Sequence, residues 1–276
     1  MDQRSSGQAF RDLHRGPRIL VLPNAWDAAS ARVIEEAGAK AIATSSAGVA
    51  FSLGYPDGQK IPRDDMLAAV RRIAVAVRVP VTADLEAGYG KGPKQVAETV
   101  RGAIDAGAVG MNLEDAADEP NQPLFELSLA VERVRAARQA ADATGVTFTL
   151  NARTDVFLGN VGEPESRLAH ALSRLAAYRD AGADCVFAPG VSDRPTIEAL
   201  VRELGCPLNI LGTPGAPPIP ELEKLGVRRV SVGSAPSRAA FTLAREITRE
   251  LLGPGTYTRL AGGISFAEMQ RVMDRG

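Results

Sequence analysis

Residues 79–90, VPVTADLEAGYG, decide the fold prediction for this chain. The apolar first half is typical of a buried β-strand, and the glycines are typical of a turn after it. Asp84 and Glu86 stand where the strand is expected to end, and side chains two residues apart point to the same side of a strand. Two carboxylates held together repel each other unless a proton or a cation joins them. Because Mg²⁺ takes oxygen ligands, this stretch indicates a metal site.

A second apolar stretch, residues 109–113, also ends in acids, Glu114 and Asp115. One acidic pair after one strand is equally compatible with a solvated loop. The carboxyl ends of neighbouring parallel strands, however, meet at one end of a barrel. Two such pairs in succession therefore favour a shared cation site.

The alternation of strand and helix continues along the chain, and many of the helices end before a glycine. Such alternation predicts a parallel sheet. Eight units within 276 residues, without a linker, favour an α/β fold with a closed (β/α)8 TIM-type barrel over an open doubly wound sheet. We expect a single domain over residues 1–276, with residues 253–276 as an additional C-terminal helical tail. The expected strands are residues 19–22, 39–44, 79–83, 109–113, 147–151, 184–187, 207–211 and 229–232.

Composition excludes several classes of protein. The net charge of −1 offers no basic surface for nucleic acid or an anionic membrane. No apolar run approaches the roughly 18 residues of a spanning helix, and the polar N-terminus lacks the apolar core of a signal peptide. Cys185 and Cys206 lie in strand-like contexts and predict buried free thiols in a reducing cytoplasm. His14 and His170 are the only histidines and fall in expected helices, so we expect no zinc or histidine-based centre.

Active sites of such barrels lie at the carboxyl ends of the strands. Three acids there, Asp84, Glu86 and Glu114, would face Arg153. Acids gather a metal, whereas an arginine binds an anion in a bidentate manner. The small-residue turn at residues 45–48 would add backbone N–H groups for a second anion contact. Together these features indicate a small, oxygen-rich, di-anionic substrate.

The chain also resembles the isocitrate lyase/phosphoenolpyruvate mutase superfamily over about residues 20–252. The resemblance rests on the order and spacing of several motifs. These are PNAWDAASARVIEEAGAKAIATSSAGVA, YPDG at residues 55–58, VPVTADLEAGYG, GAVGMNLED, LNARTD at residues 150–155, YRDAGADCVFAPG and PLNIL at residues 207–211.

The resemblance implies a cofactor, Mg²⁺ or Mn²⁺ in its place. Asp84 would be its nearest ligand, with Glu86 and Glu114 holding it directly or through waters. Arg153 would bind the substrate oxygens and any enolate, unless it serves only as an ion-pair partner of Glu114 or Asp155. The family's usual metal pair is Asp-x-Asp, so the longer arm of Glu86 is a subfamily trait.

The resemblance implies further contacts to a substrate carboxylate. Asp57 matches an aspartate that lies over the reacting carbon, although the Pro-Asp-Gly sequence is also typical of a plain turn. The remaining contacts could equally be an ordinary tight turn, a core aromatic residue and a strand-end cap. They are Ser45, Ser46 and Gly48 at the carboxylate, Trp26 at the pocket wall and Asn209 at the seventh strand.

The predicted lid departs from the family pattern. Lyases of the family carry Lys-(Lys/Arg)-Cys-Gly-His there, and the cysteine is their acid/base. The corresponding segment of this chain, EDAADEPNQPLFELS, contains no cysteine, histidine or lysine. The phosphonate mutases place lysine and asparagine in the lid, and only Asn121 could be a remnant. Glu119, Asn121 and Glu126 remain candidates for a replacement acid/base.

We therefore expect a Mg²⁺-dependent lyase that cleaves or decarboxylates a small 2-oxo or 2-hydroxy acid, oxaloacetate- or isocitrate-like, through an enolate. Decarboxylation comes first, because it needs only protonation after the bond breaks. A lyase of a larger 2-hydroxy acid, using Asp57 or a water, comes second. The alternatives are a phosphoenolpyruvate/phosphonopyruvate mutase-type isomerase or hydrolase, or a 2-oxo acid binding protein with little turnover. Family members are typically tetramers that exchange the final helix, so we expect a homotetramer or homodimer.

Overall fold

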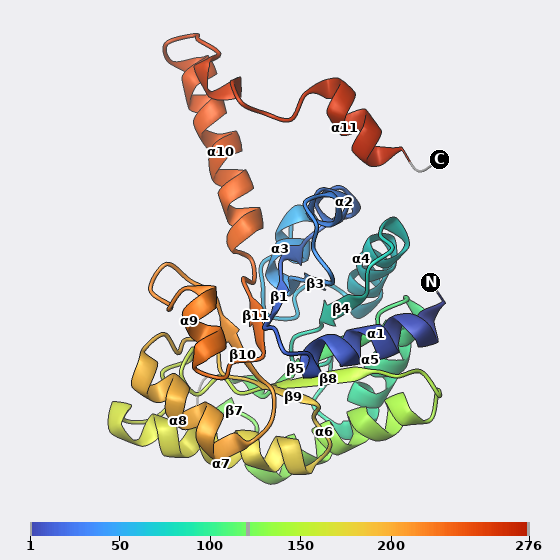
Figure 1. The fold of residues 1–276 in the computed structure, drawn as a ribbon, viewed down its shortest axis with the longest axis vertical. Coiled ribbons are helices and arrows are strands. Elements are labelled where there is room, and N and C mark those ends of the chain that lie inside the picture. Colours follow the sequence, from blue (N-terminus) through green and yellow to red (C-terminus); the bar gives the residue numbers. More distant parts are fainter. Residues whose placement is uncertain (1, 120–121, 275–276) are drawn as a thin grey trace.

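The computed structural model describes residues 2–119 and 122–274. Within them, nine strands form a parallel sheet in the order β1-β11-β10-β9-β8-β5-β4-β3-β2. Its end strands, β1 (Leu20–Leu22) and β2 (Asn24–Ala25), are two pieces of one extended segment interrupted at Pro23. β1 pairs with β11 and β2 pairs with β3, so the sheet closes on itself (Figure 1). The predicted TIM-type barrel is confirmed.

Asn24 holds this closure together. Its side-chain Nδ2 donates to the carbonyl of Thr44 at 2.8 Å. Its Oδ1 accepts from the backbone N–H groups of Val232 and Gly233, at 2.8 and 2.9 Å. One buried amide therefore connects the first, second and last strand segments of the barrel.

The remaining elements alternate as the sequence predicts. The other strands of the barrel are β3 (Ile42–Thr44), β4 (Val81–Asp84), β5 (Gly110–Glu114), β8 (Thr149–Arg153), β9 (Cys185–Phe187), β10 (Leu208–Leu211) and β11 (Arg229–Ser231). The helices between them are α2 (Ala28–Glu36), α3 (Ser46–Ser52), α4 (Arg63–Ala76), α5 (Pro93–Asp105), α6 (Leu127–Asp142), α7 (Arg167–Asp180), preceded by the short η1 (Pro164–Ser166), α8 (Arg194–Leu204) and α9 (Ile219–Lys224).

Helix α1 (Gln3–Arg15) lies against the amino-terminal ends of the barrel strands. The side chain of Phe10 is fully buried there. Gly110 on β5 lies directly against it, since a Cβ at this position would meet the Phe10 ring at 3.0 Å and the carbonyl of Thr149 at 2.7 Å. A residue without a side chain is therefore required for α1 to seal this end of the barrel.

One local expectation was wrong, and one pair of strands was not predicted. The expected turn at residues 45–48 is the first turn of α3, because the Ser45 hydroxyl accepts from the backbone N–H of Gly48 and caps that helix. The segment after β5 contains an antiparallel pair, β6 (Ala116–Glu119) and β7 (Gln122–Leu124), which the sequence did not predict. Both strands are short and neither alternates apolar with polar residues; β6 ends in two acids and β7 contains a proline.

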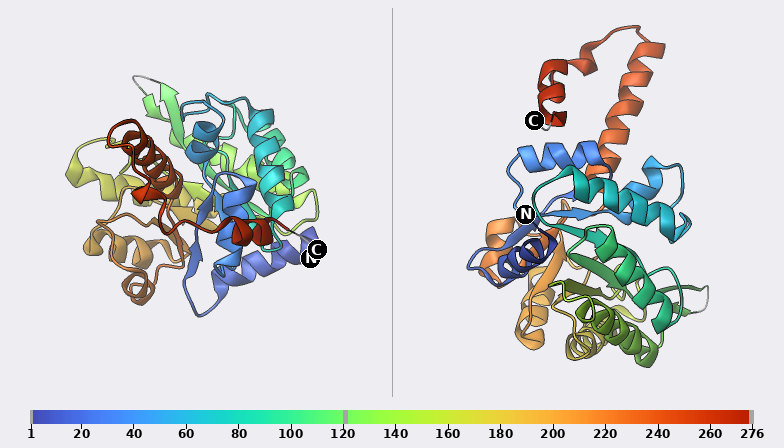
Figure 2. Two further views of the ribbon diagram at one scale, coloured as in Figure 1. Left: turned by 90° about the horizontal axis from the view of Figure 1, so that it is seen from above. Right: turned by 90° about the vertical axis from the view of Figure 1, so that its right-hand side faces the viewer.

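The C-terminal segment leaves the barrel. Helix α10 (Ala235–Leu252) projects away from it, and η2 (Thr258–Leu260) and α11 (Phe266–Met273) turn back towards α2 (Figures 1 and 2). Arg32 of α2 donates to the carbonyl of Met273 at the end of this return. Of the side chains in α10, only that of Ser237 is buried. Among the described residues, no helix is long and apolar enough to cross a membrane.

Candidate active site

Asp84, the last residue of β4, is held from two sides. Its Oδ2 accepts from the backbone N–H and the hydroxyl of Ser46, at 3.1 and 2.9 Å. Its Oδ1 faces the side-chain amide of Asn112 on β5 at 3.3 Å. Only 8% of the residue is exposed. The carboxylate therefore has a fixed orientation at the carboxyl end of the strand.

Glu86 reaches the same region by a different route from the one predicted. The strand ends at Asp84, and Glu86 lies in the following turn with a φ of +51°, so the two-residue periodicity of a strand does not apply. Its Oε2 accepts from the backbone N–H of Gln59 at 2.6 Å. Burial, then the negative charges of Asp57 and Asp84, raise the pKa of Glu86 to about 7. Without a cation, Glu86 shares its environment with acids that it repels.

Arg153 ends β8 and lies between two acids. Its Nη1 is 2.6 Å from Glu114 Oε2, and its Nε and Nη2 donate to the two carboxylate oxygens of Asp155, at 2.5 and 2.7 Å. Burial lowers the pKa of Arg153, but Glu114 and Asp155 outweigh burial and raise it, so the guanidinium stays charged. Both ion-pair alternatives named for Arg153 are thus present in the structure. They do not test its role toward a substrate.

A cavity of about 420 Å³ opens beside these groups. It is lined by residues from the loops that follow β3, β4, β5 and β8 and by the β6–β7 pair, including Gln59, Glu86, Glu114, Asp155, Glu119 and Leu124. Burial, then several neighbouring acids, raise the pKa of Glu114 well above its usual value, although Arg153 opposes this. The cavity therefore has a negative wall next to one guanidinium.

Asp57 contributes to the same electrostatic cluster from the loop before α4. Desolvation and then the charge of Asp84 raise its pKa, while Arg153 lowers it. The side chain itself is exposed. Asp57 is thus close enough to interact with the predicted metal ligands, and its catalytic role stays a prediction.

The predicted substrate contacts are brought together only in part. The hydroxyl of Ser45 and the N–H of Gly48 bond to each other, and both donors of Ser46 are used by Asp84. Trp26 is half-buried next to this turn, since a Cβ at Gly48 would meet its Cβ at 3.0 Å. Asn209 lies inside β10, away from the strand end, is fully buried and donates to the Ser231 hydroxyl at 3.1 Å.

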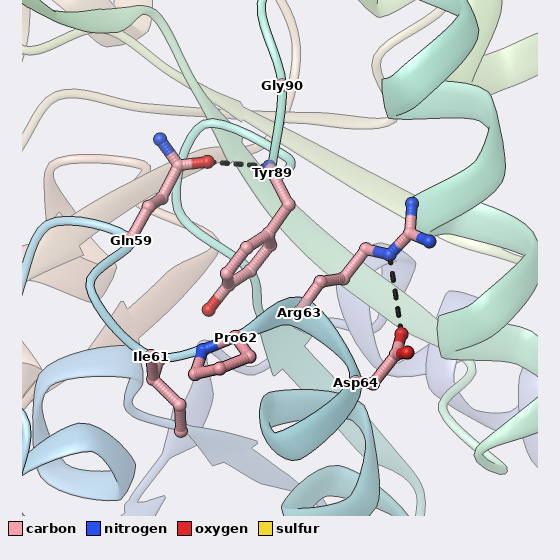
Figure 3. Close-up of a pocket in the computed structure, with 7 residues that line it drawn as sticks. All are labelled: Gln59, Ile61, Pro62, Arg63, Asp64, Tyr89 and Gly90. Atoms are coloured by element: carbon pink, nitrogen blue, oxygen red, sulfur yellow. Dashed lines mark hydrogen bonds and ion pairs between the residues drawn. The ribbon is translucent and has the colours of Figure 1, made fainter.

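Gln59 is a residue that the sequence did not single out. It has a φ of +55°, and its side-chain Oε1 accepts from the backbone N–H of Tyr89 at 2.6 Å (Figure 3). With its own N–H on Glu86, it ties the loop before α4 to the turn after β4. A second hollow of about 530 Å³ lies on the other side of Gln59, where the ring of Tyr89 points towards Pro62 (Figure 3). The Pro-Asp-Gly turn directly before Gln59 was the sequence feature that could have pointed to this residue.

Asp115 is a buried hydrogen-bond acceptor, which the sequence did not predict. It is buried and accepts from Tyr178 Oη at 2.6 Å, Arg174 Nε at 2.7 Å, Thr154 Oγ1 at 2.7 Å and the N–H of Asp155 at 2.9 Å. All its contacts lie behind the β5 and β8 strand ends. Asp115 therefore supports the loop that carries Asp155, and it does not line the cavity.

The expected lid corresponds to the β6–β7 pair. Glu119 at its end forms an ion pair with Lys91, whose Nζ lies 2.5 Å from Glu119 Oε1. Glu126 is exposed and begins α6 without capping it. Asn121 lies outside the described residues. A lysine thus reaches the hairpin from the turn after β4, although the hairpin itself contains none.

Within residues 2–119 and 122–274, no three acid, histidine or cysteine side chains converge closely enough to ligate one ion directly. Glu114 is already paired with Arg153. Asp84, Glu86 and Asp57 remain close to one another. They could hold a cation partly through waters, because Mg²⁺ usually keeps several waters beside one or two carboxylates.

The family model for phosphoenolpyruvate phosphomutase matches residues 10–252. The chain belongs to the phosphoenolpyruvate mutase/isocitrate lyase superfamily. This confirms the resemblance drawn from the motifs and makes the chain an enzyme of a lyase superfamily.

Two curated members of the superfamily resemble most of the chain. The 2-methylisocitrate lyase of Salmonella typhimurium (strain LT2) is 34% identical over 200 residues, 70% of this chain and 65% of its own. Oxaloacetate decarboxylase 2 of Pseudomonas fluorescens (strain Pf0-1) is 29% identical over 254 residues, 89% of this chain and 84% of its own.

Solved structures of superfamily members share the barrel. A protein from Burkholderia cenocepacia J2315 is 42% identical with a TM-score of 0.92, covering 98% of this chain and 95% of its own. A phosphonopyruvate hydrolase in complex with oxalate and Mg²⁺ is 25% identical with a TM-score of 0.84, covering 97% of this chain and 94% of its own.

Proposed function

We propose that this superfamily enzyme is a Mg²⁺-dependent carbon–carbon lyase acting on a small 2-oxo acid, with decarboxylation of an oxaloacetate-like substrate as its first reaction. The observation that carries the proposal is the position of Arg153. It is the charged donor among five acids around one cavity end: Asp57, Asp84, Glu86, Glu114 and Asp155.

Arg153 would act on the oxygen where negative charge develops. When the bond to the leaving carboxylate breaks, its electron pair moves to the 2-oxo oxygen and carbon dioxide leaves. A guanidinium presents donors in a planar fork, which suits an enolate and its adjacent carboxylate. Glu114 and Asp155 fix this fork in place before substrate binds, and a donor that needs no reorganisation stabilises the transition state most.

The residues around Asp84 fit a hard divalent cation. Asp84 offers carboxylate oxygens held by Ser46 and Asn112, and Glu86 and Asp57 supply negative charge that such an ion would neutralise. Mg²⁺ or Mn²⁺ bound there would act as a Lewis acid towards the 2-oxo group. The superfamily member whose structure contains oxalate and Mg²⁺ supports this assignment.

The hairpin favours the decarboxylase over a cysteine-dependent lyase. The segment from Ala116 to Leu124 has no thiol or imidazole, so the cysteine acid of the cysteine-dependent lyases is not supplied there. Decarboxylation requires a proton only after carbon dioxide has left. The decarboxylase relative supports this choice. Cleavage of a larger 2-hydroxy acid is the second candidate, and the 34% identity to a 2-methylisocitrate lyase favours it.

The first experiment is thermal stabilisation by a panel of acids, with and without Mg²⁺. The panel is pyruvate, oxaloacetate, 2-oxoglutarate, isocitrate, methylisocitrate and phosphonopyruvate. A ligand that binds the native state raises the melting temperature by mass action. We expect a Mg²⁺-dependent shift with oxaloacetate and pyruvate, turnover of oxaloacetate to pyruvate, and loss of both in Asp84→Ala. Stabilisation by methylisocitrate with cleavage of it would favour the second candidate, and no shift with any acid would reject both.

We also propose that the enzyme assembles through its C-terminal arm as a homodimer or homotetramer. Leu252 and Phe266 are 83% and 81% exposed, and Phe241 and Leu243 are also exposed on α10. A helix with such an apolar surface outside the barrel is typical of a surface that a second subunit covers.

A further inference from the structure

Arg229 on β11 is a charged side chain that is fully buried inside the barrel. Its Nη2 donates to Asn112 Oδ1 on β5 at 3.1 Å. Its Nε and Nη1 have no hydrogen-bond partner in the described part of the chain. A buried charge with two unpaired donors costs stability, so packing does not account for an arginine at this position.

The contact with Arg229 fixes the side-chain amide of Asn112. A guanidinium has donors and no acceptor, so the atom that faces it must be the amide oxygen. The Nδ2 of Asn151 donates to the same oxygen at 2.8 Å. The amide nitrogen of Asn112 is thereby turned to the opposite side, where Asp84 Oδ1 lies at 3.3 Å.

The orientation of Asn112 matters because Asp84 has few other partners on that side. Ser46 holds Oδ2 through two donors, and Asn112 is the side chain that approaches Oδ1. If the amide turned over, its oxygen would face the carboxylate and repel it. A neutral residue in place of Arg229 would leave only Asn151 to select the attractive orientation, and the amide of Asn151 could turn over as well, because its Oδ1 has no hydrogen-bond partner in the described part of the chain.

We propose that Arg229 is a positioning residue, which orients Asn112 and through it the Asp84 carboxylate for binding a divalent cation. The proposal rests on the proposed function, since it assumes that Asp84 is the cation ligand. Arg229 acts from beneath the site, on the far side of Asn112. Its effect is therefore expected on the affinity for the cation, and on turnover only through that affinity.

The test is Mn²⁺ binding, measured by the electron paramagnetic resonance signal of free Mn²⁺, together with the melting temperature of the metal-free protein. Replacing a group that orients a metal ligand typically weakens metal binding by about 10–100-fold, and we expect this for Arg229→Met. We expect its melting temperature to be unchanged or higher, because a partly unpaired buried charge is replaced by an apolar side chain. A purely structural arginine predicts the opposite pair of results, a lower melting temperature with wild-type affinity.

Further variants make the result specific. Arg229→Lys should recover part of the affinity, because it keeps a donor and offers no acceptor. The control Thr149→Val removes a different buried polar atom without a partner, the Thr149 hydroxyl, and should bind Mn²⁺ like the wild type. Arg229→Met combined with Asn112→Leu should bind no more weakly than Asn112→Leu alone, because both changes act through one amide.

The two proposals fail in different ways. If the wild type and Asp84→Asn bind Mn²⁺ equally, or neither binds it, the proposed cation site is wrong. If Asp84→Asn loses binding but Arg229→Met keeps wild-type affinity, only the positioning role is overturned. If Arg229→Met does not fold, Asn112→Leu decides the question, and wild-type affinity in that variant overturns the proposal.

Discussion

Arg153 Nη1 and Glu114 Oε2 lie 2.6 Å apart at the ends of adjacent strands β8 and β5. Both side chains are largely buried, with 15% and 11% exposed. The register pairs these two residues directly, so the ion pair follows from the barrel itself. The guanidinium is consequently fixed on rigid elements and not on a loop.

Arg153→Lys should retain the fold and lose catalysis. Lysine keeps the charge that pairs with Glu114 and Asp155 but loses the planar fork that binds two oxygens. We expect turnover of the oxaloacetate-like substrate to fall by about 10²–10³-fold, the usual effect of removing one preorganised donor. Steady-state kinetics and circular dichroism measure the two effects. Wild-type turnover in this variant would show that Arg153 is only an ion-pair partner.

The raised pKa of Glu86 predicts that the stability of the metal-free protein depends on pH. Its pKa is about 7 in the folded state, above its ordinary value of 4.5, so between these limits the folded state binds more protons than the unfolded state. The free energy of unfolding should therefore decrease as pH rises from about 5 to 7, by at most about 3 kcal/mol. Urea unfolding across this range measures the decrease.

Glu86→Gln provides the control for that pH series. The amide cannot ionise, so most of the decrease between pH 5 and 7 should disappear. A decrease that persists unchanged in Glu86→Gln would assign it to Asp57 or Glu114 instead, since the pKa of each is also raised.

Asp115→Ala should destabilise the protein strongly. It leaves Arg174, whose side chain is only 6% exposed, as an uncompensated buried charge, and such losses typically cost about 3–5 kcal/mol. Tyr178→Phe removes one donor from the same carboxylate and should cost about 1 kcal/mol. Urea unfolding of both variants gives the comparison. A stable Asp115→Ala variant without turnover would instead place Asp115 in the catalytic machinery.

Replacing Phe241 and Leu243 on α10 by serine should reduce the assembled state to the 29.0 kDa chain. The change removes exposed apolar surface that we expect a second subunit to cover. Light scattering after size exclusion measures the mass. Ile219→Ser, which changes an exposed apolar residue on α9, is the matched control and should leave the mass unchanged. A wild-type chain that is itself a 29.0 kDa monomer would refute the assembly proposal.

The sequence was sufficient for the barrel because strand and helix alternate with clear glycine boundaries. It also predicted that Arg153, Glu114 and Asp84 lie close together, because strand ends in a parallel barrel converge. It misjudged the turn at residues 45–48, where a helix cap uses the same small polar residues as a turn. It also misjudged Glu86, whose positive φ is a property of tertiary context.

Polar residues inside the expected strands also carried information about the site, and the sequence analysis did not use it. Asn112, Asn151 and Arg229 each stand within an expected strand, where a buried apolar residue would be ordinary. Periodicity shows that such residues are buried but cannot show which of them meet. The contacts between them depend on strand register, and register is fixed only when the barrel closes.

The closure at Asn24 has a consequence for how the chain folds. The amide of Asn24 finds its last partners 208 and 209 residues further along the chain. During synthesis, β1 therefore has no β11 neighbour until the 208 residues that separate Asn24 from Val232 have been added. Contacts this distant carry a large loop-closure entropy and slow the folding reaction. A chain that has not yet closed its barrel thus exposes an unpaired strand edge, a condition that favours aggregation.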